Sequence, residues 1–168
     1  MLKQIFKINY IYFIYKIKYL KMSFKSLLIL SLISISLQFF SPDTSVIQLN
    51  KDNFENEVVK SDNLWLILFY APWCGHCRAF HPQFEKLAKA AKGLFKIGAV
   101  NCENDRDLAR KYKVTGYPTV YFFGEDKTQT VEYEGERKAE KIVEFLFDKA
   151  KNVINNKLNE KKDVKTDL

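Results

Sequence analysis

Apolar residues fall into short continuous runs that alternate with stretches of helical period between residues 43 and 153. Runs of about four to eight residues bounded by turn-forming residues predict strands at 46–49, 64–70, 94–101, 119–123 and 128–133. Apolar positions three and four residues apart predict helices at 50–60, 74–93, 104–112 and 137–153. This alternation predicts an α/β domain in which helices cover a central sheet.

The run at 64–70 is the strongest of these signals. It is continuously apolar between Asn63 and Pro72 and too short for a buried helix, so we expect a central strand covered on both faces. Asn50 or Asp52 is suited to cap the first helix. Two helices present apolar stripes to the sheet, formed by Phe80, Phe84, Leu87, Ala88 and Ala91 and by Ile142, Phe145, Leu146 and Ala150.

Residues 1–42 contain no acidic residue and are interpreted as a leader outside the domain at 43–153. Within the leader, residues 22–41 have the layout of a signal peptide, with a basic start, an apolar run and a final Ser-Pro breaker. Small residues make Ser34 with Ser36, or Ser41, candidates for the cleavage site. Residues 154–168 form a charged tail that we expect to be disordered.

The segment upstream of Met22 is doubtful as part of the protein. Sixteen of its 21 residues are Ile, Lys, Tyr or Phe, which favours Met22 as the true start. The alternative is a real extension that turns residues 5–40 into a pair of membrane-associated segments. Contact with a membrane is therefore expected only if the leader stays uncleaved.

The net charge of +7 does not indicate a nucleic-acid-binding protein. Six of the 27 basic residues lie in residues 1–42, which leaves 21 basic against 20 acidic residues in the rest of the chain. A balanced domain lacks the field of one sign that binding to phosphates uses. We therefore expect no nucleic-acid partner.

The chemistry of the chain centres on a C-x-x-C motif, Cys74-Gly75-His76-Cys77, directly after the predicted central strand. A cysteine at a helix N-terminus faces unpaired N–H groups and the positive end of the helix dipole, so Cys74 should ionise readily. The two-residue spacing lets Cys77 close a disulfide with Cys74 or resolve a mixed disulfide. His76 adds a partly positive group beside the thiolate, and Trp73 offers a flat apolar surface to a substrate chain.

The segment Phe69-Tyr70-Ala71-Pro72-Trp73-Cys74-Gly75-His76-Cys77 resembles the active-site segment of the protein disulfide isomerase family, which has the thioredoxin fold with a mixed sheet flanked by helices. The resemblance includes Gly116-Tyr117-Pro118-Thr119 and Gly135-Glu136-Arg137, and covers residues 46–152. It implies that Pro118 is cis and that Tyr117 and Pro118 contact substrate. It also implies that Arg137 lowers the pKa of Cys77.

Two positions depart from the family pattern. The buried glutamate that many members carry in the strand before the motif is replaced here by Leu68, and the lysine of the facing strand by Ala99. An apolar pair is consistent in itself, because a buried lysine without its carboxylate is costly. The hypothesis is that deprotonation of Cys77 is impaired and mixed disulfides persist.

The same residues allow three alternatives to a thiol-disulfide oxidoreductase. A zinc site would need Cys102 with His76 or His81, but a second C-x-x-C is absent from the sequence, and we expect no metal and no cofactor. A cytosolic thioredoxin typically has proline where this chain has His76, and needs no leader. A thioredoxin-fold chaperone or substrate trap with weak redox turnover remains the alternative function, since Leu68 replaces the proton acceptor.

The expected setting is the lumen of the endoplasmic reticulum, where protein disulfides form. The last residues, Lys165-Thr166-Asp167-Leu168, resemble a K-D-E-L retrieval signal in their first and last residues and in an acidic third position. The resemblance implies unfolded or disulfide-containing proteins as substrates. Glutathione or an oxidase is the expected electron partner.

Overall fold

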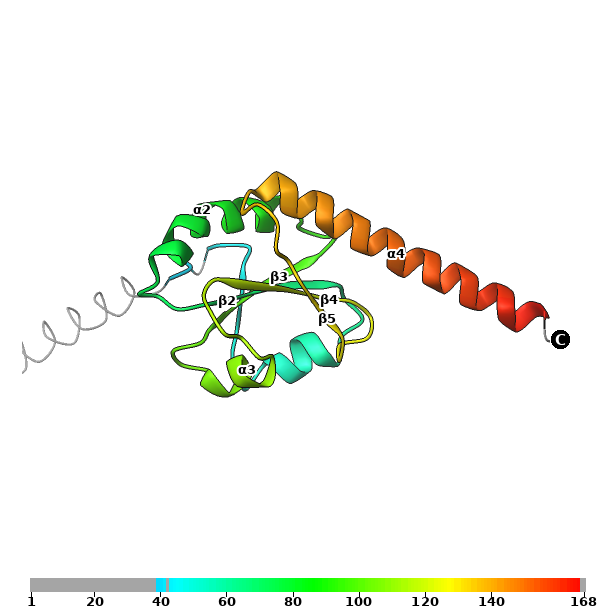
Figure 1. Ribbon diagram of the computed structural model, residues 1–168, viewed down its shortest axis with the longest axis horizontal. Helices are drawn as coiled ribbons and strands as arrows, with labels where there is room; N and C mark the ends of the chain where they lie inside the picture. The colour runs from blue at the N-terminus through cyan, green and yellow to red at the C-terminus, as the bar shows by residue number, and fades with distance from the viewer. Residues whose placement is uncertain (1–38, 42, 167–168) are drawn as a thin grey trace, which may run out of the picture. The chain divides into compact units, whose positions relative to one another are not determined.

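The computed structural model describes residues 39–41 and 43–166 and contains a five-stranded sheet (Figure 1). The strands are β1 (Ile47–Leu49), β2 (Trp65–Tyr70), β3 (Lys96–Asn101), β4 (Thr119–Phe123) and β5 (Thr130–Glu132). Their order is β1-β3-β2-β4-β5. The first three run parallel to one another, and β4 pairs antiparallel with β2 and β5. The predicted five strands and mixed central sheet are confirmed.

Strand β2 occupies the middle of the sheet, and all six of its residues are buried. Side chains alternate between faces along a strand, so Trp65, Ile67 and Phe69 enter one apolar cluster. Leu66 and Leu68 lie on the opposite face. The Trp65 indole is satisfied because its Nε1 donates a hydrogen bond to Ser61 Oγ at 3.0 Å. The predicted central strand covered on both faces is confirmed.

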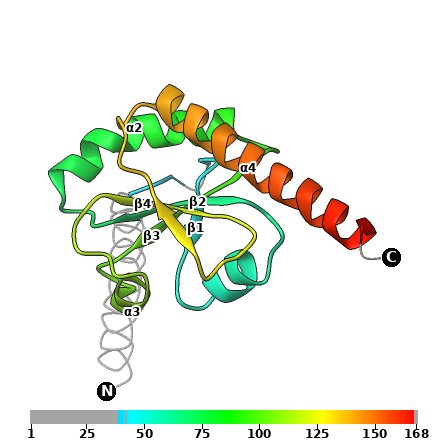
Figure 2. The ribbon, with the colours of Figure 1, turned by 45° about the vertical axis from the view of Figure 1, so that its right-hand side comes forward.

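Helices cover both faces of the sheet (Figure 2). The π-helix η1 (Glu55–Val59) and α3 (Arg106–Lys111) lie on one face, and α2 (Gly75–Ala90) and α4 (Ala139–Thr166) pack together on the other. Asn50 Oδ1 accepts hydrogen bonds from the N–H groups of Asp52 and Asn53 in the turn ahead of η1, but the N-cap residue of η1 is Phe54, without a side-chain cap hydrogen bond, so neither predicted residue caps η1 itself. Gln83 Oε1 accepts from Ala139 N at 3.1 Å and so ties the start of α4 to α2.

The prediction of disorder beyond Val153 is wrong, because α4 continues to Thr166. Residues 154–166 contain neither Gly nor Pro, and their Lys and Glu residues have good helix propensity. Lys157 also forms an ion pair with Glu125 of the β4–β5 turn.

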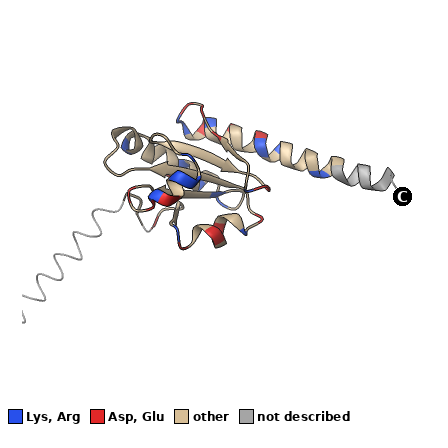
Figure 3. Ribbon diagram, turned by 60° about the horizontal axis from the view of Figure 1, so that its bottom comes forward, with Lys and Arg blue, Asp and Glu red and all other residues tan. Residues whose placement is uncertain are grey.

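Basic and acidic residues are intermixed over the helices (Figure 3). None of the helices described here is long and apolar enough to span a membrane.

Several predicted strands are shorter in the structure because turns take their ends. Leu94 and Phe95 donate backbone hydrogen bonds to the Ala91 carbonyl, so β3 begins at Lys96 instead of residue 94. Thr128 bonds to the Asp126 carboxylate through its N–H and hydroxyl, so β5 begins at Thr130 instead of residue 128. Local hydrogen bonds of this kind compete with the sheet ladder for the same backbone groups.

Phe40 packs into the domain ahead of β1, three residues before the predicted boundary at residue 43. Its side chain is 0% exposed. The ring lies 4.6 Å from the His81 ring in a stacked arrangement, 5.6 Å from Tyr70 and 6.1 Å from Phe84, centroid to centroid. Residues 1–38 lie outside the described residues, so the predicted signal peptide is not tested beyond this contact.

Substitution of Phe40 by Ala is expected to lower the free energy of unfolding by about 3–5 kcal/mol, because it removes a buried aromatic ring. Urea unfolding followed by circular dichroism measures the loss. Phe147→Ala is the matched control, since Phe147 is exposed on α4, and it should cost less than about 1 kcal/mol. Equal losses in the two variants would show that Phe40 does not belong to the core.

Candidate active site

The C-x-x-C motif lies where β2 leaves the sheet and turns into α2. Cys74 N donates to the Ala71 carbonyl at 3.1 Å, which closes the turn. Cys74 has φ −72° and ψ 119°, the extended geometry of a helix N-cap residue. The predicted position of Cys74 at the mouth of a helix is therefore confirmed, and the unpaired N–H groups of the first helical turn lie beside its sulfur.

Cys74 has the environment of an activated thiol. Its Sγ donates a hydrogen bond to the Tyr117 carbonyl at 3.6 Å, and 8% of the residue is exposed. Burial raises the pKa of Cys74, but hydrogen bonds from the Cys77 thiol and from the backbone of Cys77 and His76, with the charge of Arg78, outweigh burial and lower this pKa below its ordinary value. Cys74 is consequently the thiol of the pair that forms a thiolate first.

Cys77 has the opposite environment, since it lies in the first turn of α2 and is fully buried. Burial raises its pKa to about 12, and the neighbouring Cys74 contributes to the increase. The backbone of Ala71 and the positive charge of Arg137 act in the other direction and lower this pKa. Both cysteines are free thiols in the structure.

The loop before β4 supplies the opposite wall of the site. The Tyr117–Pro118 peptide bond is cis, as the resemblance implies. Thr119 Oγ1 donates to the Gly116 carbonyl at 2.9 Å and closes the loop. The Trp73 and Tyr117 rings meet edge to face at 6.1 Å, and Trp73 is 64% exposed. An aromatic pair thus stands beside Cys74 at the surface.

The remaining predicted site residues are exposed. The backbone of His76, and not its imidazole, is among the groups that lower the pKa of Cys74. Arg137 precedes α4 and influences Cys77 by charge. The structure therefore brings Trp73, Tyr117 and Cys74 into contact, while His76 and Arg137 border them.

Sequence reasoning missed Arg78, which lies directly after the motif. Arg78 Nη1 donates to the carbonyls of Pro72 and Trp73 at 3.2 and 3.1 Å, which braces the turn that carries Cys74. Its only signal was a basic residue directly after the motif. Cys102, named above as a ligand in the zinc alternative, is a free thiol buried in the same apolar cluster that Tyr117 packs against. Burial raises the pKa of Cys102 to about 11.

Leu68 and Ala99 are partners in the β2–β3 register, and both are fully buried. Gln48 of β1 is the register partner of Ala99, so the three side chains form a row on the face that α2 and α4 cover. Gln48 Nε2 is buried without a hydrogen-bond partner among the described residues. The row contains no ionisable group, as the sequence predicted for Leu68 and Ala99.

No group of three His, Cys, Asp or Glu side chains within residues 39–41 and 43–166 could hold a metal ion. His81, one candidate ligand in the zinc alternative, instead approaches Glu85 with Nε2 3.7 Å from Oε1. Cys102 is buried among apolar side chains. The candidate ligands of the zinc alternative therefore do not gather into one group among the described residues.

Comparison with known proteins also indicates a domain of the thioredoxin type. The thioredoxin family profile matches residues 45–148. The chain is 43% identical over 113 residues to the protein disulfide-isomerase A6 homolog of Drosophila melanogaster, covering 67% of this chain and 26% of that protein. It is 38% identical over 138 residues to the human protein disulfide-isomerase A6, covering 79% of this chain and 31% of that protein.

The similarity is to a single domain of longer proteins, because the chain spans between a quarter and a third of the length of these two relatives. The crystal structure of the Trx4 domain of ERdj5 matches with a TM-score of 0.61 at 28% identity, covering 65% of this chain and 98% of that one. The family profile and this structural match confirm the predicted thioredoxin fold.

Iodoacetamide is expected to modify Cys74 at neutral pH while Cys77 stays unmodified, because only Cys74 has a lowered pKa. The rate at Cys74 rises with pH until its thiolate is fully formed, and peptide mass mapping measures it. Arg78→Gln should move this pH profile upward, since it removes the positive charge beside Cys74. Arg110→Gln, a distant exposed arginine, is the control and should leave the profile unchanged. Equal modification of both cysteines at pH 7 would contradict the assignment.

Proposed function

We propose, from the premise that this chain belongs to the thioredoxin family, that it is a protein disulfide isomerase-type thiol-disulfide oxidoreductase acting on other proteins. The observation that carries the proposal is the contrast between two thiols three residues apart. Cys74 has a lowered pKa and is 8% exposed, whereas Cys77 is fully buried with a pKa raised to about 12. A pair with this asymmetry can attack with one thiol and hold the other in reserve.

The exchange begins when the Cys74 thiolate attacks one sulfur of a substrate disulfide. The substrate S–S bond breaks, a Cys74–substrate S–S bond forms, and the released substrate sulfur takes a proton. Cys77 then loses its proton and attacks Cys74 Sγ, which forms the Cys74–Cys77 disulfide and releases the second substrate thiol. The substrate gains two electrons and the cysteine pair is oxidised, and the reverse sequence oxidises a substrate dithiol. An isomerisation leaves the pair reduced.

In this proposal, the other residues of the site position the substrate chain or stabilise the thiolates. The exposed Trp73 ring and the Tyr117 ring form a surface on which a substrate chain lies, with Pro118 behind them. The Arg137 charge favours the Cys77 thiolate during the second step. The backbone of His76, in the first turn of α2, lowers the pKa of Cys74 and so favours its reduced state.

The proposed location is the lumen of the endoplasmic reticulum, with unfolded or disulfide-containing proteins as substrates and glutathione or an oxidase as electron partner. Residues 22–41 have the layout of a signal peptide, and the sequence ends in a retrieval-like Lys-Thr-Asp-Leu. Because Phe40 is packed in the domain, the proposed cut follows Ser36 and not Ser41. N-terminal sequencing should find Leu37 first, and a first residue beyond Phe40 would contradict this proposal.

Substitution of Cys74 or Cys77 by Ser separates the oxidoreductase from the alternative of a chaperone without redox turnover. Cys74→Ser should abolish insulin reduction, with a loss above about 1000-fold, because Cys74 is the most accessible of the described thiols and the one with a lowered pKa. Cys77→Ser should accumulate mixed disulfides with substrate, visible on non-reducing gels. Cys102→Ser is the control and should keep activity. Suppression of aggregation that persists in the Cys74→Ser variant without any loss of insulin reduction would contradict the proposal.

The absence of an ionisable group in the row beneath α2 supports slow resolution by Cys77. Leu68→Glu is expected to accelerate the decay of a Cys74–glutathione mixed disulfide by at least about tenfold, because the carboxylate accepts the Cys77 proton. Acid quenching and mass spectrometry follow the decay. Leu68→Gln is the matched control, because Gln has the shape of Glu but cannot accept the Cys77 proton. Its decay rate should equal that of the unaltered chain. Equal rates in the two variants would show that Leu68 does not limit resolution.

A further inference from the structure

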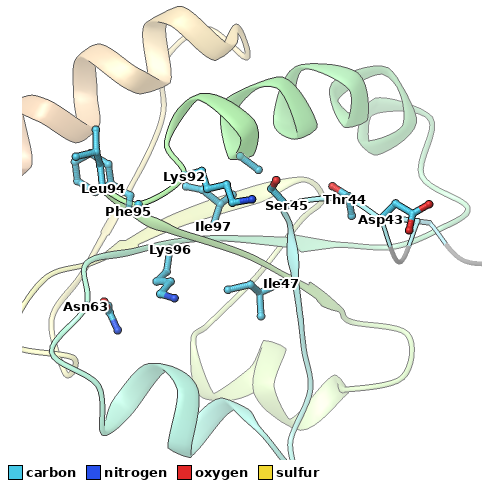
Figure 4. Close-up of a pocket in the computed structure, with 12 residues that line it drawn as sticks. Asp43, Thr44, Ser45, Ile47, Asn63, Lys92, Leu94, Phe95, Lys96 and Ile97 are labelled. Carbon is cyan, nitrogen blue, oxygen red and sulfur yellow. The ribbon is translucent and has the colours of Figure 1, made fainter.

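A cavity of about 500 Å³ opens at the edge of the sheet where β1 is shorter than its neighbour β3 (Figure 4). Strand β3 begins at Lys96, but β1 pairs only with Gly98–Val100. Residues 43–45 bend away before they reach the start of β3. In the described part of the chain, no strand residue pairs with the outer edge of β3 at Ile97, which borders the cavity, whereas Lys96 N donates to the Leu64 carbonyl on the β2 side at 3.0 Å.

Two lysines without an ion-pair partner among the described residues line this cavity. Lys92 lies in the turn after α2 and Lys96 at the start of β3, and the ion pairs of the described residues use other lysines. Figure 4 shows the Lys92 ammonium near Ser45 and the Lys96 ammonium on the side of Asn63. Asp43, the acidic residue of the lining, lies at the far end of the cavity from Lys96.

The two lysines approach the open edge from opposite faces of the sheet. Lys96 is the register partner of Trp65, whose side chain enters the cluster on the η1 and α3 face. Lys92 follows α2, which covers the other face. An extended chain lying along this edge points successive side chains to alternate faces. Two adjacent acidic residues would therefore meet Lys92 and Lys96 in turn.

We infer that this cavity binds an extended acidic segment of another polypeptide, which adds beside β3 in the place that a longer β1 would occupy. Main-chain hydrogen bonds supply affinity in strand addition, and here they are made beside Ile97, while the contacts with the two lysines supply specificity. Leu94, which is 64% exposed at the rim, offers an apolar contact to a residue flanking the acidic pair. The ligand class is a peptide with adjacent Asp or Glu residues between apolar ones.

The site is remote from the cysteines. Cys74 follows the end of β2, and the cavity lies at the start of the parallel strand β3, so the two are at opposite ends of the sheet. Six residues of strand correspond to about 20 Å. A polypeptide held at the cavity leaves Cys74 free and raises the local concentration of any disulfide attached to it. The binding itself does not depend on the redox function.

The test is a titration of the isotope-labelled chain with an acetylated and amidated octapeptide that carries Glu-Asp between valines. Amide shifts in NMR spectra are expected at Ser45–Ile47 and Lys92–Ile97, and dissociation constants follow from the same titration. Lys92→Gln and Lys96→Gln should each weaken binding by at least about threefold. Lys89→Gln, an exposed lysine of α2 outside the lining, is the matched control and should bind as the unaltered chain does.

Two further peptides sharpen the test. A Gln-Asn version should bind more weakly than the Glu-Asp peptide, and N-methylation of alternate amides should abolish binding by removing the main-chain donors. The inference is overturned if no binding is seen at millimolar peptide, if both lysine variants bind as tightly as Lys89→Gln, or if the shifts map to Trp73 and Tyr117. Equal binding of the N-methylated peptide would also overturn strand addition.

Discussion

The complete burial of β2 is the constraint on which the rest of this structure depends. Six apolar residues in the middle of the sheet need cover on both faces, and η1 with α3 on one side and α2 with α4 on the other provide it. The same burial determines where the chain can change direction, because β2 must end before the turn that carries Cys74. The position of the reactive sulfur is thus a consequence of packing, and the Arg78 hydrogen bonds secure it.

The central strand and the motif were predictable from sequence because each is a local pattern. A continuous apolar run between Asn63 and Pro72 specifies a doubly covered strand, and C-x-x-C after such a strand places Cys74 at a helix N-terminus. The apolar row at Leu68 and Ala99 was also predictable, since the positions follow from counting back from the motif. The structure supplies its third member, Gln48, through the β1 register.

Contacts between distant parts of the chain were not predictable in the same way. Phe40 reads as the end of an apolar leader, and only its contact with His81 and Tyr70 assigns it to the domain. The sequence beyond Val153 has too weak an apolar periodicity to predict a helix. The helix is stabilised there by the Lys157–Glu125 ion pair, a contact with a distant part of the chain. Arg78 was missed because it acts by donating hydrogen bonds to two backbone carbonyls, and these come within reach only when the turn is folded.

The two tryptophans of the chain occupy opposite environments, and this gives the protein two separate optical signals. Trp65 is enclosed in the core, so its fluorescence reports the integrity of the fold. Trp73 stands in solvent beside Cys74 and the Tyr117 ring, where a nearby disulfide quenches an indole and an arriving chain covers it. A change at Trp73 without a change at Trp65 therefore reports events at Cys74 in the intact protein, such as the proposed thiol-disulfide exchange, with no added label.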